Sequence, residues 1–206
     1  MSKILILTAS PRGERSVSRA LTTQFAQLWA QHHPQDTVLL RDVGHHPVPH
    51  VTEPWVVGAF APPEAQNAES KAAIAVSDQL VDEFLSADRY IFGVPMYNFN
   101  IPSTFKAYID QIVRAGKTFA VGPNGYEGLV KDKKALFITS SGGAYPAGSP
   151  MAAYNFQEPY LRTIFGFIGV TEVRFVAADS MNLGEDAAKV SREKAESALK
   201  ELVTTW

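Results

Sequence analysis

The residues best suited to chemistry in this 206-residue chain occupy three short segments, each directly after an apolar run. Residues 8–18 carry three serine hydroxyls ahead of an expected helix, and hydroxyls beside free helix amides can bind a phosphate. Residues 95–99 read Pro-Met-Tyr-Asn-Phe and offer aromatic surface next to an amide side chain. Residues 140–143 read Ser-Ser-Gly-Gly, whose exposed backbone amides can donate to a ring edge or to a negative charge. The three segments predict sites for a phosphate, a flat ring and its polar rim.

Each segment also has a purely structural explanation. Ser16 could serve only as an N-cap, residues 95–99 could be a packed turn between a strand and a helix, and the glycine pair could be an ordinary flexible turn. Arg12 and Arg15 could contact a phosphate, although solvated loop charges are the favoured interpretation for both. The functional interpretation therefore depends on whether the fold brings the three segments together.

Several other classes of site lack the residues that they need. Gly13 stands alone after the first apolar run, whereas a dinucleotide fingerprint needs several glycines, and neither a Gly-Lys-Ser/Thr ending nor a Gly-x-Ser-x-Gly elbow is present. The absence of cysteine excludes disulfides, thiolate nucleophiles and thiolate metal ligands. Histidines lie in two loops without regular spacing or a nearby carboxylate pair, so a metal site is disfavoured; they are His32, His33, His45, His46 and His50.

Composition favours a small-molecule partner. With 19 basic and 21 acidic residues the formal charge is −2, so no basic excess marks a nucleic-acid or membrane surface. No apolar run approaches the roughly 20 residues that span a bilayer. The first residues pass into a strand-like run without a cleavage signal. We expect a cytoplasmic protein with one domain over residues 1–206, because this length is ample for one core and short for two.

Apolar runs alternate with helical stripes along the whole chain. Fully apolar runs indicate strands covered on both faces, and steps of three and four indicate helices with one buried side. The proline-rich segment 44–66 is expected to be a long covering loop. The expected strands are 4–7, 37–43, 89–94, 135–139 and 173–177, and the expected helices are 16–29, 68–85, 103–115, 160–168 and 185–203.

Five strands that alternate with helices predict an α/β fold with a doubly wound parallel sheet. Ligands of such sheets bind beyond the carboxyl ends of the strands, near the point where the strand order reverses. The three polar segments follow the first, third and fourth expected strands, so we expect them to surround one mononucleotide site. FMN satisfies all three demands.

Four motifs add a family resemblance over nearly the whole length. They are Ser-Pro-Arg-Gly at 10–13 with Ser-Val-Ser at 16–18, Pro-Met-Tyr-Asn-Phe at 95–99 with Ile-Pro-Ser at 101–103, Arg-Ala-Gly-Lys-Thr-Phe at 114–119, and Phe-Gly-Phe-Ile-Gly-Val at 165–170. With these motifs the chain resembles the FMN-dependent NADH azoreductase and NAD(P)H:quinone oxidoreductase family. The resemblance implies a flavodoxin-like fold with strand order 2-1-3-4-5 and helices on both faces.

The resemblance also implies a cofactor, a reaction and site residues. FMN would be held non-covalently, with its phosphate on Ser10, Ser16, Val17 and Ser18, its ring system on Pro95, Met96, Tyr97, Asn98 and Phe99, and its pyrimidine side on Ser140, Ser141, Gly142 and Gly143. NADH or NADPH would deliver hydride to the flavin, and a quinone or azo compound would then take two electrons in the same cavity. No catalytic side chain is required, because the flavin itself carries the hydride.

Family members work as homodimers with sites at the subunit interface. In that arrangement aromatic residues would line the substrate side, two in the same chain and two from the neighbouring chain; they are Phe99 and Phe167, and Phe60 and Tyr126. Each of these residues could instead belong to the core. Trp55 and Phe60 give the covering loop an apolar character that suits a partner surface.

The chain departs from the family at Ser141, where relatives often carry arginine, and its segment 144–160 is individual, so ligand and substrate preference can differ. Two other flavin roles are open: an FMN reductase that releases reduced flavin, and a flavodoxin-type electron carrier. A net charge of −2 disfavours the carrier, which steers to its partners through an acidic field. A non-enzymatic receiver domain would need acidic residues after the first and third strands, where this chain has Ala9-Ser10 and Pro95-Met96.

Overall fold

A five-stranded parallel sheet forms the centre of the computed structural model, which describes residues 1–206 except the side chain of Pro63. The strands are β1 (Lys3–Thr8), β2 (Thr37–Asp42), β3 (Arg89–Pro95), β6 (Lys134–Ser140) and β7 (Glu172–Ala178), in the order β2-β1-β3-β6-β7. All four neighbouring pairs are parallel. The expected fold class and strand order are confirmed.

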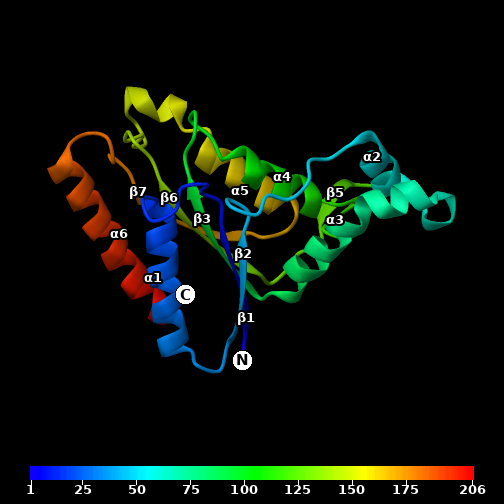
Figure 1. The fold of residues 1–206 in the computed structure, drawn as a ribbon, viewed down its shortest axis with the longest axis horizontal. Coiled ribbons are helices and arrows are strands. Elements are labelled where there is room, and N and C mark those ends of the chain that lie inside the picture. The colour runs from blue at the N-terminus through cyan, green and yellow to red at the C-terminus, as the bar shows by residue number, and fades with distance from the viewer.

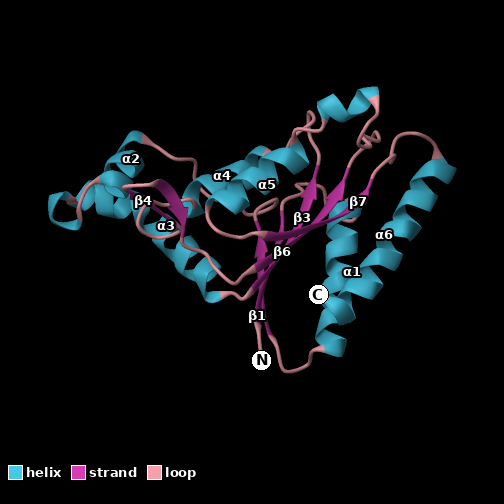
Figure 2. Ribbon diagram, turned by 180° about the vertical axis from the view of Figure 1, so that it is seen from behind, coloured by secondary structure: helices cyan, strands magenta, loops and turns pink.

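Helices cover both faces of this sheet (Figures 1 and 2). Helices α1 (Val17–His32) and α6 (Glu185–Thr205) lie side by side on one face. Helices α3 (Ala68–Ser86), α4 (Ser103–Ile112) and α5 (Gln157–Phe167) lie on the other. Among the described residues, no helix is long and apolar enough to cross a membrane.

The alternation of side chains along β1 explains how one apolar run builds two cores. Leu5 and Leu7 pack with α3, α4 and α5, whereas Ile4 and Ile6 pack with α1 and α6. Successive side chains of a strand point to opposite faces, so a strand with a helical layer on each side must be apolar throughout. All four side chains are at most 3% exposed. The apolar run itself thus specifies a buried, two-faced strand.

The expectation of a long loop over residues 44–66 is wrong, because this segment contains helix α2 (Glu53–Phe60) and the short 3-10 helix η1 (Pro63–Ala65). Thr52 caps α2 by accepting a hydrogen bond from the Trp55 amide. Pro54 occupies the first turn, where a missing amide hydrogen costs nothing. A Cβ on Gly58 would lie 2.6 Å from the Ser70 carbonyl oxygen of α3, so the glycine permits close helix packing.

Three further elements differ from the sequence-based expectation. The antiparallel hairpin of β4 (Phe119–Gly122) and β5 (Gly125–Gly128) was not expected, nor was the 3-10 helix η2 (Pro150–Tyr154). Helix α5 begins at Gln157 rather than at residue 160. Pro159 suggests a later start, but in the first turn of a helix its lack of an amide hydrogen is harmless.

A single guanidinium fastens the carboxyl ends of β1 and β2 to α1. Arg19 donates from Nη1 to Thr8 Oγ1 at 3.0 Å and forms a two-pronged contact with Asp42, at 2.7 Å and 3.0 Å. It also donates to the backbone oxygens of Ser10 at 2.6 Å and Arg12 at 3.3 Å. The loop after β1 is therefore held at two points by the same side chain.

Burial acts to raise the pKa of the Asp42 carboxyl, but the stabilising contacts outweigh it. Hydrogen bonds from Arg19 and from the His45 amide and ring, together with the Arg19 charge, hold the pKa of Asp42 well below its usual range. Because the pKa of Asp42 is lower in the folded protein than in the unfolded chain, its carboxylate stabilises the fold at pH values above the unfolded pKa. This stabilisation is lost as the pH falls from the unfolded pKa toward the folded pKa.

Replacing the carboxylate, Asp42→Asn, tests this contact. We expect the free energy of unfolding at pH 7 to fall by about 1–3 kcal/mol, discounted for the partial exposure of the pair. The deficit should shrink as the pH falls below about 4, because Asp42 of the unfolded chain then takes up a proton while folded Asp42 stays charged. Urea unfolding followed by circular dichroism at several pH values measures both effects.

Asp110→Asn provides a control, because Asp110 pairs with Lys106 at 2.6 Å on an exposed helix surface. Such pairs contribute about 0.3–0.5 kcal/mol. A deficit in Asp42→Asn that is equal at pH 3 and pH 7 would contradict the proposed ionic contribution.

Candidate functional site

The loop after β1 presents hydroxyls and free amides at the start of α1. Ser10 and Ser18 are buried, and Ser16 caps the helix by accepting from the Arg19 amide at 3.3 Å. Among the described residues, the amides of Val17 and Ser18 donate to no protein acceptor. Ser16 is thus an N-cap, and it also lines the cavity described below. It leaves the two preceding helix amides available to an anion.

The turn after β3 is tight and strained. Tyr97 and Asn100 exchange backbone hydrogen bonds at 2.8 Å and 3.0 Å, and the two residues between them, Asn98 and Phe99, have φ angles of 48° and 67°. Consecutive positive φ angles define a type I′ turn, which phenylalanine rarely adopts. Such strain persists only where the surroundings fix the conformation.

Aromatic residues from the segment after β6 provide those surroundings. The Phe99 ring meets Tyr145 edge-on with centroids 6.1 Å apart and lies 5.3 Å from the Tyr154 ring. The Phe156 amide donates to the Phe99 carbonyl at 3.1 Å. Phe99 nevertheless keeps 41% of its surface exposed, so these contacts do not cover the residue completely.

A buried amide side chain fixes the strand end below this turn. Gln157, at the start of α5, donates to the carbonyl oxygens of Val94 at 3.4 Å and Pro95 at 3.0 Å. The Met96 amide donates to Ser140 at 2.7 Å, which joins the turn to the end of β6. The ring platform and the glycine turn are therefore parts of one connected structure.

In the glycine turn after β6, residues 140–143, the carbonyls are occupied and two of the amides are free. A loop after β7 donates three backbone hydrogen bonds to it, namely Ser180 to Gly143 at 3.2 Å, Met181 to Ser141 at 3.1 Å and Asn182 to Gly142 at 2.9 Å. Within the part of the chain that the structure describes, the Gly142 and Gly143 amides have no protein acceptor. These amides can serve a ligand.

One cavity of about 210 Å³ joins the three predicted segments. Its lining includes most of the predicted cofactor residues, while Ser18, Asn98, Phe99 and Gly143 belong to the same loops without lining it; the lining residues are Ser10, Arg12, Ser16, Val17, Pro95, Met96, Tyr97, Ser140, Ser141, Gly142, Met181 and Asn182. Arg12, for which solvation was favoured, is exposed and also borders the cavity.

Three predicted substrate residues lie elsewhere in the same chain. Tyr126 and Phe167 form an aromatic cluster with Phe119 at the β4–β5 hairpin, with centroid distances of 4.9 Å to 6.1 Å. Phe60 is at the end of α2 and is 69% exposed. Phe167 thus packs against neighbouring aromatic rings of its own chain.

Sequence reasoning missed Met181 and Asn182. Both follow β7, and the rule that ligands meet the carboxyl ends of parallel strands could have included this fourth loop. Neither residue belongs to a motif or carries a charge, so the sequence offered no other signal.

The donor set of the cavity fits FMN. Its lining combines serine hydroxyls, helix amides and glycine amides with Arg12 as the one charged residue among the described lining. Hydroxyls, amides and a guanidinium suit a phosphate and the polar edge of a flavin, and no carboxylate of the lining would repel either. The described residues contain no group of three or more His, Cys, Asp or Glu side chains that could hold a metal.

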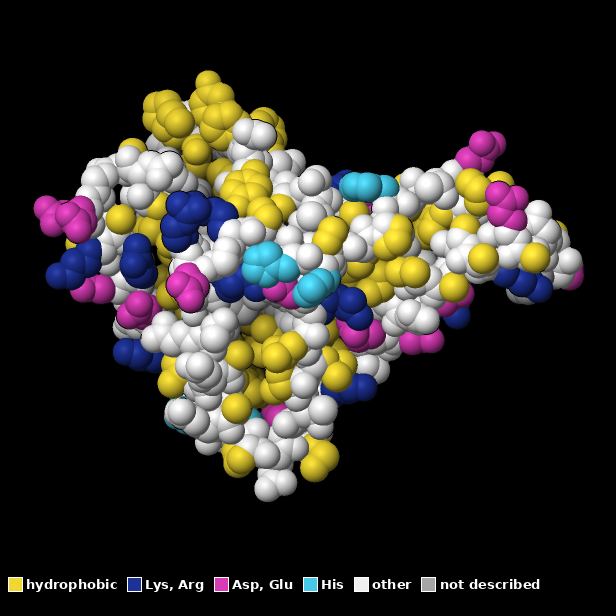
Figure 3. Space-filling model, viewed as in Figure 1, with side chains coloured by type: hydrophobic (Ala, Val, Ile, Leu, Met, Phe, Trp, Pro, Cys, Tyr) yellow, Lys and Arg dark blue, Asp and Glu magenta, His cyan; other side chains and the backbone are white. Residues whose placement is uncertain are grey.

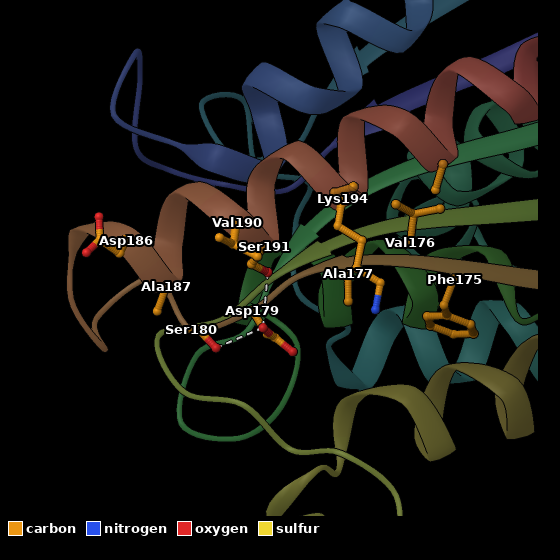
Figure 4. Close-up of a pocket in the computed structure, with 12 residues that line it drawn as sticks. Phe175, Val176, Ala177, Asp179, Ser180, Asp186, Ala187, Val190, Ser191 and Lys194 are labelled. Carbon is orange, nitrogen blue, oxygen red and sulfur yellow. Dashed lines mark hydrogen bonds between the residues drawn. The ribbon is translucent and has the colours of Figure 1, made fainter.

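A larger groove of about 700 Å³ runs between β7 and α6 (Figure 4). It is lined by apolar and serine side chains together with Asp179, Asp186 and Lys194. The loops after β1 and β3 contribute nothing to its described lining, so this groove lies away from the place where the three predicted segments meet. The smaller cavity is therefore the candidate functional site.

Comparisons with known proteins identify the family of the chain. The family model described as the flavodoxin-like fold matches residues 2–203. The chain belongs to this flavodoxin-like family. The resemblance recognised from the motifs is confirmed by a protein of Trichormus variabilis named FMN-dependent NADH:quinone oxidoreductase 2, which is 58% identical over 207 residues and covers 100% of both chains.

Solved structures with the same flavodoxin-like fold are also similar. An azoreductase from Bacillus anthracis (Sterne) is 31% identical, with a TM-score of 0.93 and 100% of both chains covered. An FMN-dependent NADH-azoreductase from Bacillus anthracis (Ames Ancestor), solved in complex with FMN, is 25% identical, with a TM-score of 0.88 and coverage of 98% of this chain and 100% of that chain.

The contacts of Gln157 predict a measurable role in fixing the ring platform. Gln157→Met keeps the side-chain volume but leaves the Val94 and Pro95 carbonyls without their donor, which should lower the free energy of unfolding by about 1–3 kcal/mol. Urea unfolding gives this value. The exposed Gln27→Met on α1 is the matched control and should change stability by less than about 0.5 kcal/mol. Equal effects of the two substitutions would contradict the assignment.

Proposed function

We propose that this chain is an FMN-dependent oxidoreductase that uses NADH to reduce quinones and azo compounds. The carrying observation is the single cavity where hydroxyls, helix amides and glycine amides from three strand ends meet beside an aromatic turn. Membership of the flavodoxin-like family and the 58% identity to a relative named FMN-dependent NADH:quinone oxidoreductase 2 support the same activity.

The proposed binding mode assigns each loop one part of FMN. Ser10, Ser16, Val17 and Ser18 hold the phosphate, because their hydroxyls and the free amides of Val17 and Ser18 are donors at a helix N-terminus. Residues 95–99 carry the ring system. Residues 140–143 bind its pyrimidine side through free glycine amides.

The reaction uses orientation and charge rather than a catalytic side chain. Bound FMN supplies the chemistry by accepting hydride and passing two electrons on. The chain holds the ring against the Pro95–Phe99 turn, which leaves one face open to a flat donor or acceptor. The Gly142 and Gly143 amides stabilise negative charge on the reduced ring, at about 1.5–3 kcal/mol for each charge-assisted bond.

We propose further that the enzyme is a cytoplasmic homodimer with sites at the subunit interface. A cavity of about 210 Å³ is smaller than the about 300–1,000 Å³ of sites that enclose a drug-sized ligand, so the substrate side needs another wall. Figure 3 shows a group of hydrophobic side chains over η2, which is the segment drawn in yellow in the ribbon of Figure 1. Phe60 and Tyr126, 69% and 71% exposed, are suited to complete a partner's site.

Flavin titration and steady-state kinetics test the proposed activity. The apoprotein should bind FMN, and NADH oxidation should require both bound FMN and a quinone, with parallel double-reciprocal lines when the two substrates are varied. NADH should be preferred over NADPH. FMN that stays with the protein through gel filtration after reduction would separate this enzyme from a reductase that releases reduced flavin. Failure to bind FMN would overturn the proposal.

The interface proposal predicts a selective effect of Phe60→Ala. Removing this exposed ring should lower kcat/KM for a quinone by about five- to thirty-fold, which corresponds to about 1–2 kcal/mol of lost aromatic contact. FMN affinity should stay the same, since Phe60 does not line the cofactor cavity of its own chain. Val76→Ala, an exposed apolar position on α3, is the control. A wild-type monomer in sedimentation equilibrium, fully active with quinone, would contradict the interface.

A further inference from the structure

Three consecutive residues of the loop after β7 are bonded to the glycine turn. Residues 180–182 donate to the carbonyls of residues 141–143 at 2.9 Å to 3.2 Å, and the Ser141 amide donates to Ala178 at 3.1 Å. Ser141 Oγ adds a bond to the Gly143 carbonyl at 2.7 Å. With every carbonyl of the turn engaged in this way, the orientation of the Gly142 and Gly143 amides follows from the position of the β7 loop.

The Asn182 side chain lies directly over Gly142. A Cβ built on Gly142 would be 3.1 Å from Asn182 Cγ and closer than van der Waals contact to Nδ2. Asn182 and Met181 also line the cavity that contains Ser10, Pro95 and Tyr97. The absence of a side chain at residue 142 therefore makes room for the Asn182 amide at the edge of the cofactor site.

Helix α6 holds the start of this loop. The Asp179 carboxylate accepts hydrogen bonds from Ser180 Oγ at 2.9 Å and from Ser191 Oγ at 3.1 Å, and Figure 4 shows Asp179 between the two serines. Ser180 has a φ angle of 62°, so the chain turns sharply just after this anchor. The anchor fixes a strained bend, which limits how far the Asn182 side chain can move.

We propose that Asn182 is a further cofactor-binding residue, which donates its side-chain amide to the pyrimidine side of FMN beside the Gly142 and Gly143 amides. Asp179 and Ser191 are positioning residues that act through it. The proposal rests on the proposed function, because it requires FMN in the cavity. The uncharged Asn182 amide, as a donor to the pyrimidine side of FMN, would stabilise the flavin ring most when that ring carries negative charge. Asn182 thus favours the reduced state.

Two substitutions at residue 182 test the contact through affinity and potential. Asn182→Ala should weaken FMN binding to the apoprotein by about three- to ten-fold, the value of one hydrogen bond. The nearly isosteric Asn182→Asp should weaken reduced FMN at least about ten-fold more than oxidised FMN, which lowers the two-electron midpoint potential by about 30 mV or more. Fluorescence titration and redox titration measure these effects. Asn124→Asp, in the exposed β4–β5 turn, makes the same charge change as a control.

A double-mutant cycle with Gly142→Ala separates contact from general disruption. In wild type the new methyl group collides with the Asn182 amide, so FMN affinity should fall by about ten-fold or more. In the Asn182→Ala background the same methyl group has space, and the further loss should be less than about three-fold. A substitution that damages the turn for other reasons would cost the same in both backgrounds.

The outcomes distinguish this inference from the proposed function. If wild type does not bind FMN, the proposed function fails and the assignment of Asn182 fails with it. If wild type binds FMN while both residue-182 variants match Asn124→Asp in affinity and potential, only the assignment of Asn182 is overturned. Should the alanine variant fail to fold, the potential of Asn182→Asp decides the question alone.

Discussion

The Arg19–Asp42 contact is the constraint on which the phosphate side of the site depends. Parallel strands end without a covalent connection between neighbours, so their carboxyl ends need another means of alignment. Arg19 joins the ends of β1 and β2 and two backbone oxygens of the following loop. Its helix also begins at that loop, so one side chain sets the distance between the helix amides and the sheet. Asp42 keeps this guanidinium compensated in a place where solvent reaches it only partly.

The remainder of the site is built from polar contacts that occupy one side of each turn. Carbonyls of the strand ends are bonded to Gln157 and to the loop after β7, while the neighbouring amides have no protein acceptor among the described residues. Because each peptide group has its donor and acceptor on opposite sides, engaging the carbonyls on one side presents the amides on the other. Free backbone amides act as hydrogen-bond donors without a charged side chain, which suits a ligand whose charge changes during the reaction.

The sequence predicted the elements whose signal is local. Strand β1 was recognised because a strand with two covered faces must be apolar at every position, and the serine loop because hydroxyls beside a helix start have a known use. Helix α2 was missed because the prolines of segment 44–66 resemble loop residues, although Pro54 lies at the start of the helix. The φ angles of Asn98 and Phe99 and the position of Asn182 result from contacts between distant segments, and no local pattern encodes them.

Residues 144–156, between the glycine turn and α5, contact the site without being part of either apolar core. Tyr145 and Tyr154 pack against Phe99, yet no described residue from 144 to 156 is a member of either apolar core. Changes of length or composition there would remove nothing from either apolar core, although they would alter the packing around Phe99 and the walls that an electron acceptor meets. Natural selection can therefore vary the range of acceptors through this segment at little risk to the fold. The cofactor loops, tied to every strand end, have no such freedom.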